Sequence, residues 1–203
     1  MHSTTAPFTL ESWTAGRTHE RRAGFRGTVP VFGDIVLTAP LPRKATPGSI
    51  VSEVRGSSIP TATFETRGIH TEAADLPTLN RSTLRVGDAQ VYLERNRFGV
   101  THRGRALHFR YGGDHYLLWA VNRKQFVLAR EADDEDPGVS LTAKQSGIGA
   151  GRKLAVRVTG RAVAADIALV TLFAGVDRAP LTRGGAVRSA LGRSTRLFAE
   201  SQY

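Results

Sequence analysis

Short apolar runs separated by glycine and polar turns fill the middle of the chain, from Thr83 to Thr159. The turns recur about every 8–12 residues, a rhythm typical of an antiparallel meander. At its end Leu154, Val156 and Val158 alternate with Ala155 and Arg157, which predicts a last strand. Weaker strand patterns precede this region at residues 35–38, 50–54 and 61–66, with prolines and glycines between them.

The clearest local pattern is a hairpin within residues 105–121, where Gly112-Gly113 suits a two-residue turn with positive φ. That turn places Tyr111 opposite Asp114 and Phe109 opposite Tyr116. One face then holds the mainly apolar residues Leu107, Phe109, Tyr111, Tyr116 and Leu118, and the other holds His108, Arg110, His115 and Trp119. This division is typical of a sheet with one buried face.

After Gly160 the apolar residues no longer alternate as in a strand. Residues 162–176 are apolar on nearly every side, apart from Asp166 near the first turns, and the alanines favour a helix that ends at Gly175 and Pro180. A helix that is apolar all round is buried in a protein core or in a membrane. The nearly apolar run Val163–Val176 is shorter than the roughly 20 residues that a membrane span needs, so we predict burial in the core.

Together these patterns predict a mainly β fold: an antiparallel β-barrel or meander with a buried apolar helix near the C-terminus. The predicted organisation is a basic N-terminal arm or edge segment over residues 1–30, a barrel-like domain over 31–178 with its helix at about 162–176, and a basic tail over 179–203. Another β-barrel type or a β-sandwich is the main alternative.

The pattern resembles the tubby-like barrel superfamily, which includes LURP-one-related and phospholipid scramblase-like proteins. The residues that carry the resemblance are Leu154–Thr159 followed by Ala162–Asp177, within a similarity covering residues 31–178. The resemblance implies a closed antiparallel barrel around a central hydrophobic helix, and a binding or membrane-associated role rather than catalysis. The basic tail after Pro180 departs from it, because the helix of that family lies closer to the end of the chain.

The net charge of the chain indicates a class of binding partner. The 203 residues carry a formal net charge of +10, which favours phosphate-bearing partners such as anionic lipid, phosphorylated ligands or nucleic acid. Because 24 of the 28 basic residues are arginine, the composition of a GC-rich genome is an equal explanation. The chain has no cysteine, and its N-terminus lacks the layout of a secretory signal. We therefore expect a cytoplasmic protein, peripheral to a membrane at most.

The basic tail supplies the candidate binding residues. Arg183, Arg188, Arg193 and Arg196 are the candidate anion- or lipid-binding residues, and Leu197 and Phe198 are the candidate membrane anchors. Basic amphipathic segments lie in membrane interfaces, where each Lys or Arg contributes about 1 kcal/mol near an anionic leaflet. The alternative is that the apolar residues dock the tail onto the barrel.

No pattern predicts an active site, and we expect no metal and no cofactor. His102, His108 and His115 lie near Asp114, but a solvent-facing strand explains them equally well. The acidic run Asp133–Asp136 lacks the spacing of an EF-hand and predicts a solvated turn. The glycine-rich segment Ser146–Lys153 has neither P-loop nor GxGxxG spacing and predicts a loop between strands.

The sequence therefore predicts a non-catalytic binding module for an anionic lipid surface or a phosphorylated ligand. A first alternative is a nucleic-acid-binding protein, which would stack bases on the outward-facing members of a set comprising Tyr92, Tyr111, Tyr116 and Trp119. A second alternative is a subunit of an assembly, which would pair an edge strand or the N-terminal arm with a protein partner.

Overall fold

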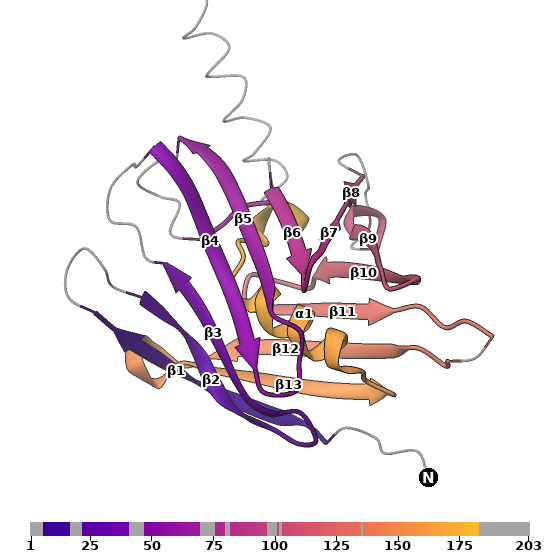
Figure 1. Ribbon diagram of the computed structural model, residues 1–203, viewed down its shortest axis with the longest axis horizontal. Coiled ribbons are helices and arrows are strands. Elements are labelled where there is room, and N and C mark those ends of the chain that lie inside the picture. Colours follow the sequence, from indigo (N-terminus) through magenta and orange to yellow (C-terminus); the bar gives the residue numbers. More distant parts are fainter. Residues whose placement is uncertain are drawn as a thin grey trace, which may run out of the picture.

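The computed structural model describes residues 6–16, 22–40, 47–69, 76–79, 82–96, 101, 103–134 and 136–182. Within these residues, thirteen antiparallel strands form one sheet that curls into a nearly closed barrel, with one α-helix inside it (Figure 1). The prediction of a mainly β fold with a helix near the C-terminus is confirmed.

Consecutive strands pair with one another except β7 and β8, which form the two edges of the sheet, and β1 pairs with β13. The first half of the sheet comprises β1 (Phe8–Ala15), β2 (Arg22–Val29), β3 (Gly33–Pro40), β4 (Pro47–Gly56), β5 (Ala62–Ile69), β6 (Ser82–Val86) and β7 (Ala89–Val91). The second half comprises β8 (Leu93–Arg95), β9 (Leu107–Tyr111), β10 (Asp114–Ala120), β11 (Gln125–Arg130), β12 (Val139–Ser146) and β13 (Lys153–Gly160). The helix is α1 (Ala164–Ala174), and three short 3₁₀ turns are η1 (Arg103–Arg105), η2 (Gly149–Gly151) and η3 (Ala179–Leu181).

The chain itself closes the barrel at Tyr92. This residue separates β7, which pairs with β6, from β8, which pairs with β9. The two edges of the sheet are therefore consecutive in the chain, and β7–β8 crosses from one edge to the other. We call this crossing the seam.

The predicted hairpin is present as β9 and β10, with Phe109 opposite Tyr116 and Tyr111 opposite Asp114. Gly112 and Gly113 have φ values of 62° and 93°, the positive region that a tight hairpin turn requires. Leu107, Phe109, Tyr116 and Leu118 are buried, and His108, Arg110 and His115 are exposed. The two predicted faces are confirmed.

Helix α1 occupies the interior and packs against both halves of the barrel. Its residues from Asp166 to Ala174 are all buried, which explains why the sequence is apolar on every side. The Phe173 ring lies 5.9 Å from that of Phe64 on β5 and 5.8 Å from that of Phe109 on β9. Among the described residues, no helix combines the length and the apolar character that crossing a bilayer demands.

The N-terminal segment is a correction to the predicted arm or edge over residues 1–30. Strands β1 and β2 lie inside the sheet, β1 between β13 and β2, and β2 between β1 and β3. Their apolar alternation is short. Phe8 and Leu10 are buried, but the inward-facing position of β2 between the buried Phe25 and Val29 is Gly27, where a Cβ would lie 3.2 Å from the Leu10 side chain. A glycine at that position interrupts the apolar signal that the prediction relied on.

The helix runs from one end of the barrel to the other. It begins after β13, at the end that carries the β9–β10 and β11–β12 connections, and finishes at the end that carries the β10–β11 and β12–β13 connections. The described chain stays on the barrel beyond Ala179, because Leu181 in η3 is fully buried in the core. A tail that extends from the barrel therefore starts no earlier than Thr182.

Candidate functional site

A buried ion pair fixes the first turn of α1. The Asp166 carboxylate, which is fully buried, receives hydrogen bonds from Nε of Arg130 at 3.2 Å, from the Tyr116 hydroxyl at 2.9 Å and from the Val163 N–H at 2.8 Å. A carboxylate at a helix N-terminus also interacts favourably with the helix dipole. These bonds explain how a charged residue is accommodated in an otherwise apolar helix.

The guanidinium of Arg130 extends this network to the start of β10, to the β11–β12 loop and to the residue that follows β13. It lies 3.3 Å from Asp136 and 3.9 Å from Asp114, and it donates to the Arg161 carbonyl at 2.9 Å. Its side chain is 2% exposed. Because its partners all belong to the fold, Arg130 holds the helix in place and has little capacity for an external ligand.

The environment sets the protonation of this network. Burial acts to lower the pKa of Arg130, but Asp166 and Asp136 outweigh it and raise the pKa, so the guanidinium is charged at neutral pH. Burial raises the pKa of Tyr116, and the neighbouring Asp166 carboxylate raises it further. The Tyr116 hydroxyl therefore remains a hydrogen-bond donor across the neutral range.

The far end of α1 is held mainly through its carbonyl groups. Arg178 is buried and donates to the carbonyls of Phe173 and Val176, with its guanidinium 4.3 Å from the centre of the Phe126 ring. Ser52 donates to the Gly175 carbonyl at 2.7 Å. Burial lowers the pKa of Arg178 to about 10, so the residue is a cation at neutral pH, as the helix C-terminus favours.

Exposed cations gather around this same end of the barrel. They come from η1 before β9, from the β10–β11 turn, from β12 and from the β12–β13 loop, because alternate connections of an up-and-down sheet share one end. We call them the basic rim: Arg103, Arg123, Lys124, Lys144, Arg152 and Lys153, all exposed.

The basic rim keeps most of its positive charge unpaired. Lys153 lies 3.5 Å from Glu11, but no carboxylate of the described residues lies within 4 Å of the other rim cations. Arg103 stacks over Trp119 at 5.5 Å and Arg152 over Phe25 at 5.8 Å, contacts that orient the cations without neutralising them. Asp177, which follows α1 at this end, accepts a hydrogen bond from the Ala179 N–H.

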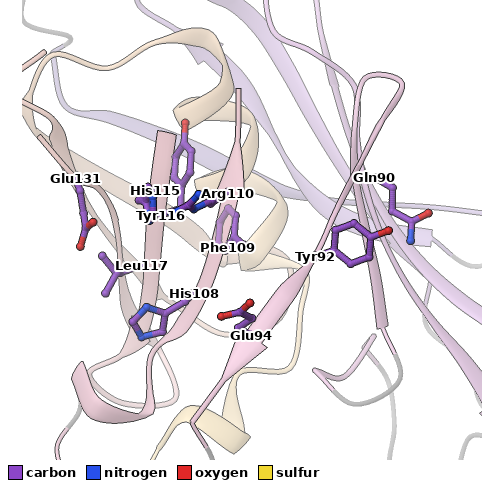
Figure 2. A pocket seen from close by; sticks show the side chains of 10 residues that line it. All are labelled: Gln90, Tyr92, Glu94, His108, Phe109, Arg110, His115, Tyr116, Leu117 and Glu131. Atoms are coloured by element: carbon purple, nitrogen blue, oxygen red, sulfur yellow. The ribbon is translucent and has the colours of Figure 1, made fainter. Parts of the chain in front are cut away.

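A groove of about 470 Å³ lies beside the seam. Figure 2 shows Gln90 and Tyr92 on one side of it and Arg110 and Phe109 on the other, with the Phe109 ring stacked on Tyr116 at 5.1 Å behind. Glu94, His108, His115, Leu117 and Glu131 complete the lining.

The groove offers hydrogen-bonding groups of both charges, with the carboxylates of Glu94 and Glu131 and the guanidinium of Arg110. His108 lies opposite Glu94 in the strand register, and Arg110 lies opposite His115. Two carboxylates thus outnumber the one guanidinium in the groove, whereas the basic rim consists of cations. No cluster of three or more metal-ligating side chains occurs in the described part of the chain.

The predicted binding residues Arg183, Arg188, Arg193 and Arg196, and the anchors Leu197 and Phe198, lie outside the described residues, as does His102. Of the proposed stacking residues, Tyr116 is buried, Tyr111 and Trp119 are half-buried, and Tyr92 is 79% exposed.

The acidic run forms a turn in which Asp133 accepts the Asp136 N–H at 2.7 Å. The glycine-rich segment joins β12 to β13, as predicted.

Sequence reasoning missed both the Arg130–Asp166 pair and the basic rim. Asp166 was noted only as a residue near the helix start, although a lone carboxylate in an apolar helix demands a buried partner. That signal points to a cation but does not say which one. The rim cations are scattered from position 103 to position 153, and only the strand order brings them together.

Comparisons with known proteins add little. No protein-family model matches the chain, and no curated protein matches it in sequence. Among solved structures, it is similar to the di-domain ARO/CYC StfQ from the steffimycin biosynthetic pathway, with 9% sequence identity and a TM-score of 0.23 over 92% of this chain and 90% of that chain. A likeness of this size carries no argument about fold or activity.

Proposed function

We propose that the protein is a non-catalytic binding module whose basic rim engages an anionic partner, either a lipid surface or a phosphorylated ligand. The observation that carries the proposal is the convergence of exposed cations at one end of the barrel, most of them without a carboxylate partner among the described residues. Lysine and arginine side chains in such clusters attract phosphate groups through charge and hydrogen bonds.

The predicted tail residues belong to the same proposal. The described chain ends at Thr182, just after η3 and beyond the C-terminal end of α1. Arg183 follows directly in the sequence, so Arg183, Arg188, Arg193 and Arg196 would add to the field of the rim, and Leu197 and Phe198 would serve as membrane anchors. Membership of the tubby-like barrel superfamily is part of the proposal, supported by the buried helix inside an antiparallel barrel.

The proposal predicts that removing two rim charges weakens anion binding. The double variant Arg123→Gln/Lys124→Gln should bind vesicles containing phosphatidylserine about 30-fold more weakly than the parent chain, at about 1 kcal/mol per cation. The matched control is Arg55→Gln/Arg85→Gln, which removes the same charge from exposed positions on β4 and β6. Co-sedimentation over a series of salt concentrations measures both.

Three further measurements complete the test. Inositol hexakisphosphate, measured by calorimetry, serves as a soluble phosphate probe, and a quadruple glutamine variant of the four tail arginines tests the tail in the full chain. Equal weakening by the rim and control variants would show that binding follows net charge alone and would overturn the proposal. Tighter binding to a single-stranded oligonucleotide than to either anionic probe would favour the nucleic-acid alternative.

A further inference from the structure

One apolar side chain projects from the basic end of the barrel. Ile148, in the β12–β13 loop, is 89% exposed, more than any other large apolar residue in the described part of the chain. Val121, in the β10–β11 turn at the same end, is 42% exposed. Single exposed apolar residues are common on protein surfaces, so the surroundings must decide whether this one has a role.

The loop holds Ile148 in place. Gly147 and Gly149 on either side have φ values of 77° and 59°, a region that glycine adopts without strain. The Ser12 hydroxyl donates to the Ala150 carbonyl at 2.7 Å, which ties the loop to β1. The isoleucine is therefore presented outward by a braced loop.

Cations flank the isoleucine along the chain and on the neighbouring turn. Arg152 follows it in the same loop, Lys153 begins β13, and Lys144 precedes it on β12. The Lys124 carbonyl accepts the Gln145 N–H at 2.7 Å, which joins the β10–β11 turn to β12. An apolar tip flanked by cations matches a bilayer surface, where phosphates lie outside the apolar layer. A soluble phosphate ligand would pair with the cations and leave the isoleucine in water.

We propose that the partner of the basic rim is an anionic bilayer and that Ile148 inserts into its interface. This inference rests on the proposed function and names its target. The rim cations contact the headgroups, and the loop tip replaces water around Ile148 with lipid. The insertion is shallow, because a single loop tip is apolar while the residues behind it are charged.

The absence of cysteine makes insertion directly measurable. Ile148→Cys gives a single thiol for an environment-sensitive fluorophore such as NBD, and Val31→Cys is the matched control, an apolar residue 77% exposed at the opposite end. With vesicles of phosphatidylcholine and phosphatidylserine, the emission of the label at 148 should rise and shift to the blue, while that at 31 should not. Equal responses at both positions, or none at either, would overturn the insertion.

Affinity provides a second readout that separates this inference from the function on which it rests. Ile148→Ser should weaken binding to the anionic vesicles by about tenfold, Ile148→Leu should not, and neither should change binding of inositol hexakisphosphate. If Ile148→Ser leaves vesicle binding unchanged while the rim variant weakens it, insertion is wrong and the rim function stands. If neither anionic probe binds the parent chain, the proposed function itself fails.

Discussion

The two ends of the barrel carry their charges in different ways. Where α1 begins, Asp166 and Arg130 are buried together, and Asp114 and Asp136 approach the same guanidinium from the loops. Where α1 finishes, the buried Arg178 donates to the helix carbonyls, and the basic rim faces solvent. The first end therefore contains a buried ion-pair network, whereas the rim cations other than Lys153 have no carboxylate within 4 Å among the described residues.

This difference separates charges that maintain the fold from charges that are available to a partner. Breaking a buried, hydrogen-bonded pair leaves an uncompensated ion in a low-dielectric interior, whereas changing an exposed cation costs the fold little. Substitutions of the buried charges where α1 begins should thus lower the free energy of unfolding. Substitutions in the basic rim should weaken binding of an anionic partner.

The largest expected effect follows from Asp166→Ala. It leaves Arg130 buried without its main partner and removes the acceptor for the Val163 N–H, so the free energy of unfolding should fall by about 3–5 kcal/mol. Urea unfolding followed by circular dichroism measures it. The control Asp134→Ala removes an exposed carboxylate from the same end and should change stability by less than about 0.5 kcal/mol. Similar losses in both variants would contradict a special role for the buried pair.

How far the sequence predicts this architecture depends on the range of each interaction. The β9–β10 hairpin and α1 were predictable because their signals are local: a Gly-Gly turn between alternating residues, and a run apolar on all sides. Strand β2 was not, because Gly27 occupies the inward-facing position between Phe25 and Val29 where its pattern needed an apolar residue.

The site was less predictable than the fold. The Arg130–Asp166 pair joins residues 36 positions apart, and the rim cations come from connections separated by whole strands. The spacing of residues along the chain does not predict such long-range contacts, because they depend on strand order and on how the sheet closes. The sequence therefore pointed to the cations of the tail, which are close together along the chain, and passed over those of the barrel.

A smaller effect is expected from the Tyr116 hydroxyl. Tyr116→Phe removes its bond to Asp166 and should cost about 1 kcal/mol at neutral pH. Because the pKa of Tyr116 is raised in the folded state, its contribution is complete below the unfolded pKa of about 10 and is lost as pH rises above it. Above the unfolded pKa the parent chain should lose up to about 1.4 kcal/mol per pH unit relative to the variant, so the stability gap of about 1 kcal/mol should close and then reverse.

Unfolding in urea at a series of alkaline pH values tests this expectation. Tyr92→Phe is the control, because it removes a hydroxyl from a ring that is 79% exposed. If the gap between the parent chain and Tyr116→Phe stays constant above pH 10, the buried hydroxyl is not the group that links stability to alkaline pH.

The smallest expected effect compares the exposed loop residues of the two ends. Val31 has a φ of 73°, a left-handed conformation that strains a β-branched residue, whereas Ile148 has an extended φ of −135°. Val31→Gly should therefore stabilise the fold by about 0.5–1 kcal/mol, and Ile148→Gly should stabilise it not at all, because glycine there only adds freedom to the unfolded chain. Thermal unfolding of the two variants measures the difference. A gain at position 148 as large as that at position 31 would mean that backbone strain is not what distinguishes the two loops, and that Ile148 is held outward at a cost of its own.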